Sequence, residues 1–328
     1  MSEGKLGWGV LATGGIARVF TQDLLAHGHR VAAVGSRTLA AAESFARPFE
    51  IPRAYGSYEE LVADPVVDVV YIATPHNFHA ANAALALENG KHVLVEKAFT
   101  LNETQAREIT GLGQRHQLLV MEAMWTRFLP HMEHVRSFIR DGRVGEVRSV
   151  HADHTQRLPS DAKHRINNPH LAGGALLDLG IYPISFAFDM LGRPAQMQAC
   201  ATFKDSGVDA SVATIFRHTN GGISTTYSSS ETRGPNAATV LGTDGRIEIA
   251  ATWYAPAKVT LYDPDNKLVE EFDQPVTGRG MQYQAAEVER LLRDGKTAST
   301  LMPPEESVAI MATMDDIRST IGLRYPDE

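Results

Sequence analysis

A glycine-rich turn between a strand-like and a helix-like segment sets the narrowest limits on how this chain folds. The apolar residues 6–11 lead directly into the six residues Ala12-Thr13-Gly14-Gly15-Ile16-Ala17. Such a turn lets the backbone approach a pyrophosphate, whose charge is stabilised by the free N–H groups and positive dipole end of the following helix. We therefore predict a dinucleotide-binding turn formed by Ala12, Thr13, Gly14, Gly15 and Ile16.

The turn departs at one position from the G-x-G-x-x-G/A pattern of such sites. Ala12 stands where the first glycine makes the tight turn, whereas Gly14 fits the close-approach position and the small Ala17 fits the third. The alternative interpretation is an ordinary connection between a strand and a helix. The rest of the chain has to decide between the two.

The next strand-like segment bears on the choice of cofactor. Apolar residues 31–35 end in Ser36-Arg37. An acidic residue there would accept hydrogen bonds from a free ribose 2′-hydroxyl, whereas the Arg37 guanidinium suits a 2′-phosphate. Ser36 and Arg37 therefore predict that NADP(H) is preferred, with NAD(H) as the second choice.

Length and charge limit the class of protein. A chain of 328 residues exceeds what one hydrophobic core usually organises, so we expect two domains, at 1–125 and 126–328. The net charge of −8, without a basic tract, argues against nucleic acid and anionic membrane as partners. No uninterrupted apolar stretch approaches the roughly 18 residues that span a bilayer, and residues 1–5 contain no signal-peptide core, so we expect a cytoplasmic protein. The single cysteine, Cys200, suits a reducing compartment and is expected to be a small buried apolar side chain.

Strand and helix patterns alternate over the first 125 residues. Strands are expected at 6–11, 31–35, 66–74, 92–96 and 118–122, and helices at 16–26, 39–49, 58–63, 78–88 and 102–116. This alternation is typical of a parallel sheet covered by helices on both faces. The predicted fold class is thus α/β, beginning with a Rossmann-type doubly wound parallel sheet.

The second part of the chain has a different pattern, with many short strands between a few helices. Helices are expected at 129–141, from 173 to about 191, at 282–294 and at 304–321, with strands between 147 and 272. This order predicts an α+β domain with a large, mainly antiparallel, open-faced sheet. We expect the open face to form a homodimer interface, in a dimer or a tetramer; the alternative is that the terminal helices cover it.

The strand ends of the first domain carry polar side chains. Ligands of an open parallel sheet bind outside the carboxyl ends of its strands, and these ends contain Thr74, Pro75, His76, Asn77, Glu96, Lys97 and Trp125. Lys97 follows an apolar strand and stands beside Glu96, so it can transfer a proton or polarise a substrate hydroxyl. The alternative for Lys97 is an ordinary surface lysine.

Several segments together resemble the family of glucose-fructose oxidoreductase, inositol dehydrogenase and MocA (Gfo/Idh/MocA). They are residues 9–17, Ser36-Arg37, Ala73-Thr74-Pro75, 90–97 and 173–182. Residues 122–128 and Tyr182 are similar to the branch that contains dimeric dihydrodiol dehydrogenase and NADP-dependent D-xylose dehydrogenase. The later β-rich third resembles the family only in general layout.

The resemblance implies roles for three residues. Lys97 matches the catalytic lysine of the family's Glu-Lys motif, and Asp178 and Tyr182 match two polar positions of its second-domain motif. Many members carry histidine in place of Tyr182, whereas a tyrosine is expected in the dihydrodiol branch. A phenol has a reference pKa near 10, so it exchanges a proton at neutral pH only if a nearby cation such as Lys97 stabilises the phenolate. The structural alternatives are a half-buried aromatic for Tyr182 and an N-cap for Asp178.

Other conspicuous side chains receive less specific expectations. Three histidine pairs, at 76 and 79, 131 and 134, and 151 and 154, have no convincing third ligand, so we expect no metal site. His76, Asn77 and His79 are expected near the cofactor or sugar. Trp125 and Arg127 are expected to stack on the cofactor or bind its phosphate; the alternative is that they stabilise the domain junction.

These features predict an NADP(H)-dependent oxidoreductase. It would transfer hydride between the nicotinamide and a carbinol or carbonyl carbon of a sugar, cyclic polyol or trans-dihydrodiol, with Lys97 and Tyr182 managing the proton and Asp178 orienting substrate or side chain. The alternatives are a reductase of keto-sugars or anhydrosugars and a non-catalytic sensor that binds a dinucleotide.

Overall fold

The computed structural model describes residues 5–326. The expectation that the N-terminus carries no export signal concerns residues 1–4, which lie outside the described residues. The chain divides into two compact units: unit 1 is Met1–Trp125 with Thr277–Val308, and unit 2 is Thr126–Val276 with Ala309–Glu328. The expected division assigned all of 126–328 to one domain, so the structure differs by returning Thr277–Val308 to unit 1.

Unit 1 contains a six-stranded sheet in the order β3-β2-β1-β4-β5-β6, with every neighbouring pair parallel. Its strands are β1 (Gly7–Leu11), β2 (Arg30–Gly35), β3 (Ala54–Tyr55), β4 (Val69–Ile72), β5 (His92–Glu96) and β6 (Val120–Ala123). Its helices are α1 (Gly15–Ala26), α2 (Leu39–Ala46), α3 (Tyr58–Ala63), α4 (His79–Glu88), α5 (Glu103–His116) and α8 (Gln282–Arg293). The strand order is that of a doubly wound Rossmann sheet, whose direction of winding reverses between β1 and β4. The predicted parallel α/β sheet is confirmed.

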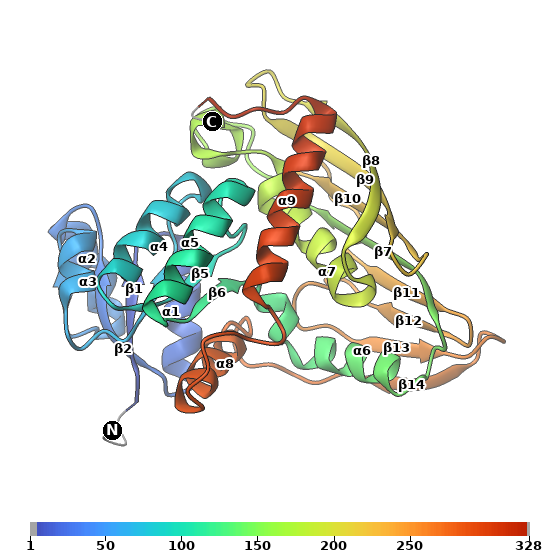
Figure 1. The fold of residues 1–328 in the computed structure, drawn as a ribbon, viewed down its shortest axis with the longest axis horizontal. Coiled ribbons are helices and arrows are strands. Elements are labelled where there is room, and N and C mark those ends of the chain that lie inside the picture. Colours follow the sequence, from blue (N-terminus) through green and yellow to red (C-terminus); the bar gives the residue numbers. More distant parts are fainter. Residues whose placement is uncertain (1–4, 327–328) are drawn as a thin grey trace. The chain divides into compact units, whose positions relative to one another are not determined.

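Local sequence explains where several of these helices begin. The side chains of Thr38, Ser57 and Asn102 accept hydrogen bonds from backbone N–H groups in the first turns of α2, α3 and α5. These caps satisfy donors that have no partner within the helix. Helices α4 and α5 pack against each other, as Figure 1 shows. The strands β1, β4 and β5 are almost wholly buried between such layers.

Helix α8 belongs to unit 1 because buried polar contacts attach it and the preceding turn to β1 and α1. The Asp23 carboxylate accepts hydrogen bonds from the backbone N–H groups of Arg279 (3.1 and 3.0 Å) and Met281 (2.9 Å). Glu289 accepts a hydrogen bond from the Trp8 indole (3.0 Å) and lies 2.7 Å from Nδ1 of His29. No local pattern in the sequence announces contacts between segments so far apart.

Unit 2 contains an eight-stranded sheet in the order β14-β13-β12-β11-β7-β10-β9-β8. Its strands are β7 (Val147–Thr155), β8 (Pro194–Phe203), β9 (Asp209–His218), β10 (Ile223–Ser229), β11 (Ala238–Gly242), β12 (Arg246–Ile249), β13 (Val259–Tyr262) and β14 (Leu268–Phe272). All neighbours are antiparallel except β7 and β10. Its helices are α6 (Pro130–Arg140) and α7 (Ile181–Leu191), and the boundary after Val308 falls inside α9 (Pro304–Ile321). The predicted, mainly antiparallel sheet is confirmed.

The two faces of the eight-stranded sheet differ in whether helices pack on them. Helix α7 packs on β7 and β10, and α6 packs on β13, so both lie along one face (Figure 1). Along β9, buried residues alternate with exposed or half-exposed ones, and the opposite face carries the exposed side chains of Ile215, Ile223 and Tyr227. Cys200 pairs with the half-exposed Ala213 and is itself exposed, so the expectation of a buried cysteine is wrong. The alternation of β8 turns it away from the core.

Within the described residues, Pro169–Leu191 is long and apolar enough to cross a membrane by length and composition alone. In the folded protein, 94% of its most apolar window is buried. This segment is the central helical stretch of unit 2, and its apolar side chains supply the core.

Candidate active site

The glycine-rich turn leaves open space at the amino end of α1. Gly14 is the N-cap of α1, with extended backbone and no side-chain cap, and a Cβ added at Gly14 or Gly15 would meet no atom within 4 Å. The first turn of α1 contains no acidic residue. Uncapped N–H groups, a positive helix end and space for a close approach together fit a pyrophosphate. The turn therefore fits the pyrophosphate of a dinucleotide. Contacts of Thr13 and Ile16 with that dinucleotide stay a prediction.

Ala12 adopts a backbone conformation that usually belongs to glycine. Its φ is +87°, and its N–H donates to the carbonyl oxygen of Gly35 at 3.0 Å. The turn thus keeps the shape of the glycine pattern although the first glycine is missing. This explains why the departure at Ala12 does not remove the dinucleotide-binding geometry.

The end of β2 presents a cation beside this turn. Ser36 is buried, and its hydroxyl lies 3.4 Å from that of Thr13. Arg37 is exposed. Its positive charge reaches Tyr58, where it partly offsets the rise in pKa that burial causes. An exposed guanidinium at this point can pair with a ribose 2′-phosphate.

The end of β4 is held by a buried histidine. His79 has no exposed surface; its Nε2 lies 2.8 Å from the carbonyl oxygen of Thr74, and its Nδ1 lies 2.9 Å from that of Ala98. Burial lowers its pKa, while the carbonyl oxygens of Thr74 and Ala98 act in the opposite direction. His79 therefore ties the loop after β4 to the loop after β5; that it also contacts the cofactor stays a prediction.

The other predicted residues at this strand end differ in exposure. Thr74, Pro75 and Asn77 are half-buried, and the Thr74 hydroxyl accepts a hydrogen bond from the Asn82 amide at 3.2 Å. His76 is buried, and its ring meets that of His79 edge-on at 5.6 Å. The backbone and half-buried side chains of this loop are the parts available to a ligand.

The end of β5 places a buried acid next to the candidate catalytic lysine. Glu96 is the last residue of β5 and accepts a hydrogen bond from the Tyr71 hydroxyl. Burial raises the pKa of Glu96, and the positive charge of Lys97 acts in the opposite direction. Lys97 is half-buried, so it is not an ordinary surface lysine. A partly desolvated ammonium at a strand end is suited to proton transfer.

Trp125 and Arg127 belong to different units of the chain. Trp125 is buried in unit 1, and the exposed Arg279 guanidinium lies over its ring at 4.9 Å. Arg127 is buried in unit 2 and donates from Nε to the Ser185 hydroxyl (2.9 Å) and from Nη2 to the Ser185 carbonyl oxygen (2.7 Å). Arg127 thus contacts α7; that it binds the cofactor stays a prediction, beside the alternative that it stabilises the domain junction.

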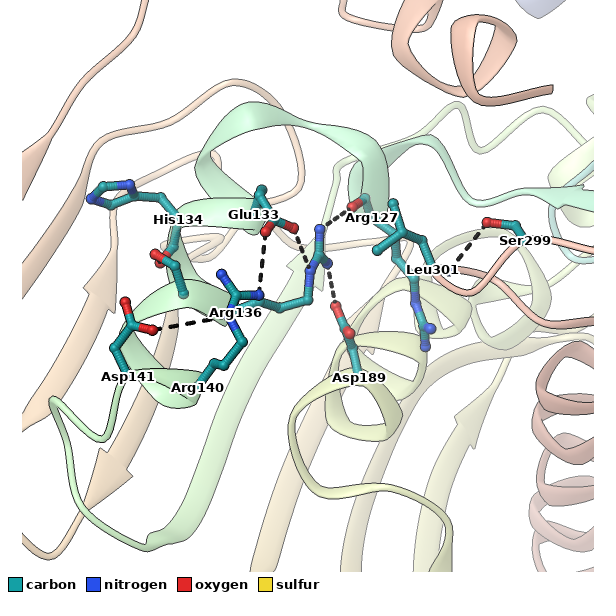
Figure 2. A network of polar contacts seen from close by, with 10 residues as sticks. Arg127, Glu133, His134, Arg136, Arg140, Asp141, Asp189, Ser299 and Leu301 are labelled. Atoms are coloured by element: carbon teal, nitrogen blue, oxygen red, sulfur yellow. Dashed lines mark hydrogen bonds and ion pairs between the residues drawn. The ribbon is translucent and has the colours of Figure 1, made fainter. Parts of the chain in front are cut away.

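A second arginine extends this contact toward α7. Arg136 of α6 donates to the Arg127 carbonyl oxygen at 2.8 Å and to the Asp189 carboxylate at 2.9 Å, as Figure 2 shows. Both partners of the Arg136–Asp189 ion pair are largely shielded from water. These contacts join α6 and the residues just before it to α7, the helix that carries Tyr182.

Asp178 and Tyr182 lie on one continuous helical stretch of unit 2. Leu176–Gly180 forms a π-helical turn that leads into α7. The Asp178 carboxylate is buried, and Nη2 of Arg165 lies 3.1 Å from each of its oxygens. The four-residue spacing therefore spans a widened turn and a regular one, which the sequence did not indicate.

Aromatic rings hold the Tyr182 side chain. Its ring meets that of His154 edge-on at 4.7 Å and lies 5.4 Å from that of Tyr254, while His154 and Tyr254 stack on each other at 3.7 Å. Tyr182 is 5% exposed, which leaves little freedom for its ring. Such packing fixes the direction of the phenol hydroxyl more firmly than a half-buried surface aromatic would allow.

Three residues near these side chains were not found from the sequence: Arg165, His154 as a ring partner, and Tyr254. Arg165 lies in a polar loop with no periodicity, and Tyr254 follows a strand far along the chain. Their proximity to Asp178 and Tyr182 depends on the tertiary fold. The only feature of the sequence that could have indicated Arg165 is its positive charge in the loop before Asp178.

No metal cluster occurs among residues 5–326, where no three His, Cys, Asp or Glu side chains gather closely enough. The predicted histidine pairs instead serve internal contacts. His131 lies 3.0 Å from the Trp253 carbonyl oxygen, and His151 lies 2.7 Å from the Thr225 hydroxyl.

Family models match most of the chain. The model of an oxidoreductase family with an NAD-binding Rossmann fold matches residues 6–124, and the model of the GFO/IDH/MocA C-terminal domain matches residues 132–248. The chain belongs to the Gfo/Idh/MocA oxidoreductase family. This membership makes it an NAD(P)-dependent oxidoreductase and confirms the resemblance found in the sequence.

Individual members of the Gfo/Idh/MocA family are similar along almost the whole chain. D-xylose 1-dehydrogenase (NADP(+)) of Hypocrea jecorina is 37% identical, over 98% of this chain and 93% of the relative. Trans-1,2-dihydrobenzene-1,2-diol dehydrogenase of Mus musculus is 36% identical, over 98% of this chain and 99% of the relative. The solved structure of KijD10, a 3-ketoreductase from Actinomadura kijaniata in complex with NADP and TDP-benzene, has a TM-score of 0.85 at 26% identity and covers 97% of this chain and 98% of that one.

Proposed function

We propose that this protein is an NADP(H)-dependent dehydrogenase that oxidises a CH–OH group of a sugar, cyclic polyol or trans-dihydrodiol, or reduces the matching carbonyl. The observation that carries the proposal is the exposed Arg37 at the end of β2, next to the open amino end of α1. It is supported by relatives named for D-xylose and for a trans-dihydrodiol, one of which is specified as NADP(+)-dependent.

The chain's own residues would handle binding and the proton. The bound nicotinamide supplies the redox chemistry by accepting or giving a hydride. Gly14 and Gly15 would receive the pyrophosphate, and Arg37 the 2′-phosphate. As an alcohol is oxidised, its hydroxyl proton must leave, and the side chains of Lys97 in unit 1 and Tyr182 in unit 2 are the groups we assign to handle that proton.

Asp178 would orient these groups. Its carboxylate is already paired with Arg165, so its charge is balanced and its direction fixed. A carboxylate held in this way can accept a hydrogen bond from a substrate hydroxyl. In the reverse direction the same residues would return a proton to the carbonyl oxygen, as reduction by a ketoreductase requires.

Substitution of Lys97 and Tyr182 tests the catalytic assignment. The purified protein is assayed with D-xylose, an inositol, an anhydrosugar and a trans-dihydrodiol, each with NADP⁺ and NAD⁺. For a substrate that is turned over, Lys97→Met and Tyr182→Phe should each lower kcat by about 100-fold or more, while NADPH binding stays nearly unchanged. Lys296→Met, at an exposed lysine of the same unit, is the control.

The outcomes separate the proposal from its rivals. Unchanged turnover in Lys97→Met would remove this lysine from the mechanism. NADPH binding without turnover of any substrate in either direction would favour a dinucleotide-binding sensor. Activity confined to keto-sugar reduction would assign the opposite physiological direction, which the similarity to a 3-ketoreductase also supports.

We also propose that unit 2 forms a homodimer, or the repeating pair of a tetramer, through the uncovered face of its sheet. That face carries Ile215, Ile223 and Tyr227, which are 52%, 47% and 40% exposed. Adjacent apolar side chains on a broad sheet are typical of a surface that binds a second copy. Because strands β9 and β10 pair with each other, these side chains lie close together on one face of the sheet.

A further inference from the structure

The helical stretch that carries Asp178 and Tyr182 begins without an ordinary cap. It follows Gly173 and Gly174, and the residue before the π-helical turn, Ala175, offers no side-chain hydrogen bond. The first backbone N–H groups of such a stretch have no acceptor within it. An acceptor must therefore come from elsewhere in unit 2.

Asp209 supplies that acceptor from the first residue of β9. It has no exposed surface, and its Oδ2 accepts a hydrogen bond from the Leu176 N–H at 2.6 Å. Burial raises the pKa of Asp209 to about 6, while hydrogen bonds from Leu176 and Ala175 favour its charged form. A carboxylate at the positive end of a helix is well placed electrostatically.

Gly174 makes room for this carboxylate. Its φ is +114°, and a Cβ at this position would lie 2.0 Å from Oδ1 of Asp209. The position of a Cβ is fixed by the backbone, so a side chain at 174 cannot rotate away from this overlap. The Asp209 carboxylate is fully buried and has little room to move instead. The glycine thus serves the approach of Asp209 to the helical stretch as well as the turn itself.

Lys204 lies between Asp209 and the loop that contains Arg165, the partner of Asp178. Lys204, on the connection before β9, lies close enough that its charge favours the ionised form of Asp209. Its ammonium donates to the Asn167 side-chain oxygen at 2.6 Å, and the Asn167 amide donates to the carbonyl oxygens of Pro159 and Asp161 at 2.8 Å each. These contacts hold the loop that contains Arg165.

We propose that Asp209 is a positioning residue for the proton-handling groups: by fixing the start of the helical stretch at Leu176, it sets the direction in which Asp178 and Tyr182 point. The proposal rests on the proposed function, because it assigns Asp209 an effect on the reaction without contact with substrate or cofactor. Leu176 precedes Asp178 by two residues and Tyr182 by six. A shift of the helix start therefore displaces both side chains together.

Substitution of Asp209 and Gly174 tests this arrangement. Asp209→Asn keeps one acceptor oxygen, and Asp209→Ala keeps none, so kcat should fall by about 10-fold and about 100-fold respectively. KM for NADP⁺ should stay within about twofold, because the turn at Gly14 lies in unit 1. Gly174→Ala should lower kcat because its Cβ overlaps the Asp209 carboxylate. In the double variant with Asp209→Ala, the fall in kcat should be smaller than the product of the falls in the two single variants. Asp205→Asn, an exposed acid on the same connection, is the control.

Hydrogen exchange separates the positioning role from the proposed function. Measured by mass spectrometry, exchange in Asp209→Asn should accelerate in residues 174–183 and not in residues 12–26, whether or not a substrate has been found. Equal exchange in 174–183, or a folded Asp209→Asn enzyme with unchanged kcat, would overturn the proposal. If Asp209→Ala does not fold, Lys204→Met serves in its place, and an unchanged kcat together with unchanged exchange in 160–183 would count against it.

Discussion

Ala12 is a residue whose backbone, rather than its side chain, serves the predicted cofactor site. At φ +87° an alanine is strained, whereas glycine adopts this conformation freely. Ala12→Gly should therefore raise the free energy of unfolding by up to about 1 kcal/mol, without weakening NADPH binding. Urea unfolding and cofactor titration measure both quantities.

The matched control is Ala17→Gly, in the buried interior of α1. That change removes a well-packed methyl group and loosens a helical residue, so it should lower stability by about 1 kcal/mol or more. If Ala12→Gly is as destabilising as Ala17→Gly, the turn does not have the conformation described.

His131 gives unit 2 a pH dependence. Burial lowers its pKa from 6.5 to about 4, and Nε2 lies 3.0 Å from the Trp253 carbonyl oxygen. As the pH falls, His131 takes up a proton in the unfolded chain near pH 6.5 but in the folded protein only near pH 4. The contribution of the neutral ring to the free energy of unfolding is therefore complete above about pH 6.5 and is lost as the pH falls toward 4. The loss approaches about 3 kcal/mol.

Comparison with a variant that cannot titrate isolates this effect. The free energy of unfolding of the wild type minus that of His131→Asn should decrease between pH 7 and about pH 5. NMR titration of the His131 ring provides the pKa directly. The same difference at both pH values, or a ring pKa near 6.5, would contradict the assignment.

Helix α8 shows how one buried side chain can fix a whole element. Asp23 of α1 accepts hydrogen bonds from the backbone of Arg279 and Met281, just before α8. Asp23→Ala leaves these donors without their acceptor and should lower the free energy of unfolding by about 2–4 kcal/mol. Asp23→Asn retains one acceptor oxygen and should cost less, while Gln22→Ala, exposed on the same helix, should change little. A small effect of Asp23→Ala would mean that apolar packing alone holds α8.

At the scale of elements, the sequence predicts what depends on local periodicity and fails where contacts are distant. The buried strands β1, β4 and β5 and the helices expected at 58–63 and 102–116 follow from local patterning; in the structure Ser57 and Asn102 cap the starts of these helices. Strand β3 was missed because Ala54–Tyr55 is too short to show a period. The return of α8 to unit 1 depends on Asp23 and Glu289, whose partners no local pattern identifies.

The same limit applies to the candidate site. Lys97, Asp178 and Tyr182 follow from a strand end and from family resemblance, whereas Arg165 and Asp209 become visible only in three dimensions. For His79 and Arg127 the sequence predicts a contact with the cofactor, and it does not indicate their contacts within the protein. In the structure each of them satisfies backbone carbonyl groups in the interior.

At the scale of the whole molecule, the proposed dimer predicts a change in mass. Ile215→Asp and Tyr227→Asp place charges on the uncovered face of the sheet, where an interface would have to desolvate them. The double variant should therefore be monomeric by sedimentation at concentrations where the wild type is dimeric or tetrameric. Leu25→Asp, at a 37% exposed leucine of α1, is the control. A monomeric wild type, or an unchanged mass of the double variant, would contradict the proposed interface.

The ratio of kcat/KM for NADP⁺ to that for NAD⁺, compared between the wild type and Arg37→Asp, tests cofactor use most directly. Arg30→Asp, at the opposite end of β2, is the control because its charge lies away from the carboxyl ends of the strands. The wild type should favour NADP⁺, Arg37→Asp should lower this ratio by about 100-fold or more, and Arg30→Asp should leave it unchanged. A wild type that prefers NAD⁺, or a ratio that Arg37→Asp leaves intact, would contradict the assignment of NADP(H) to this site.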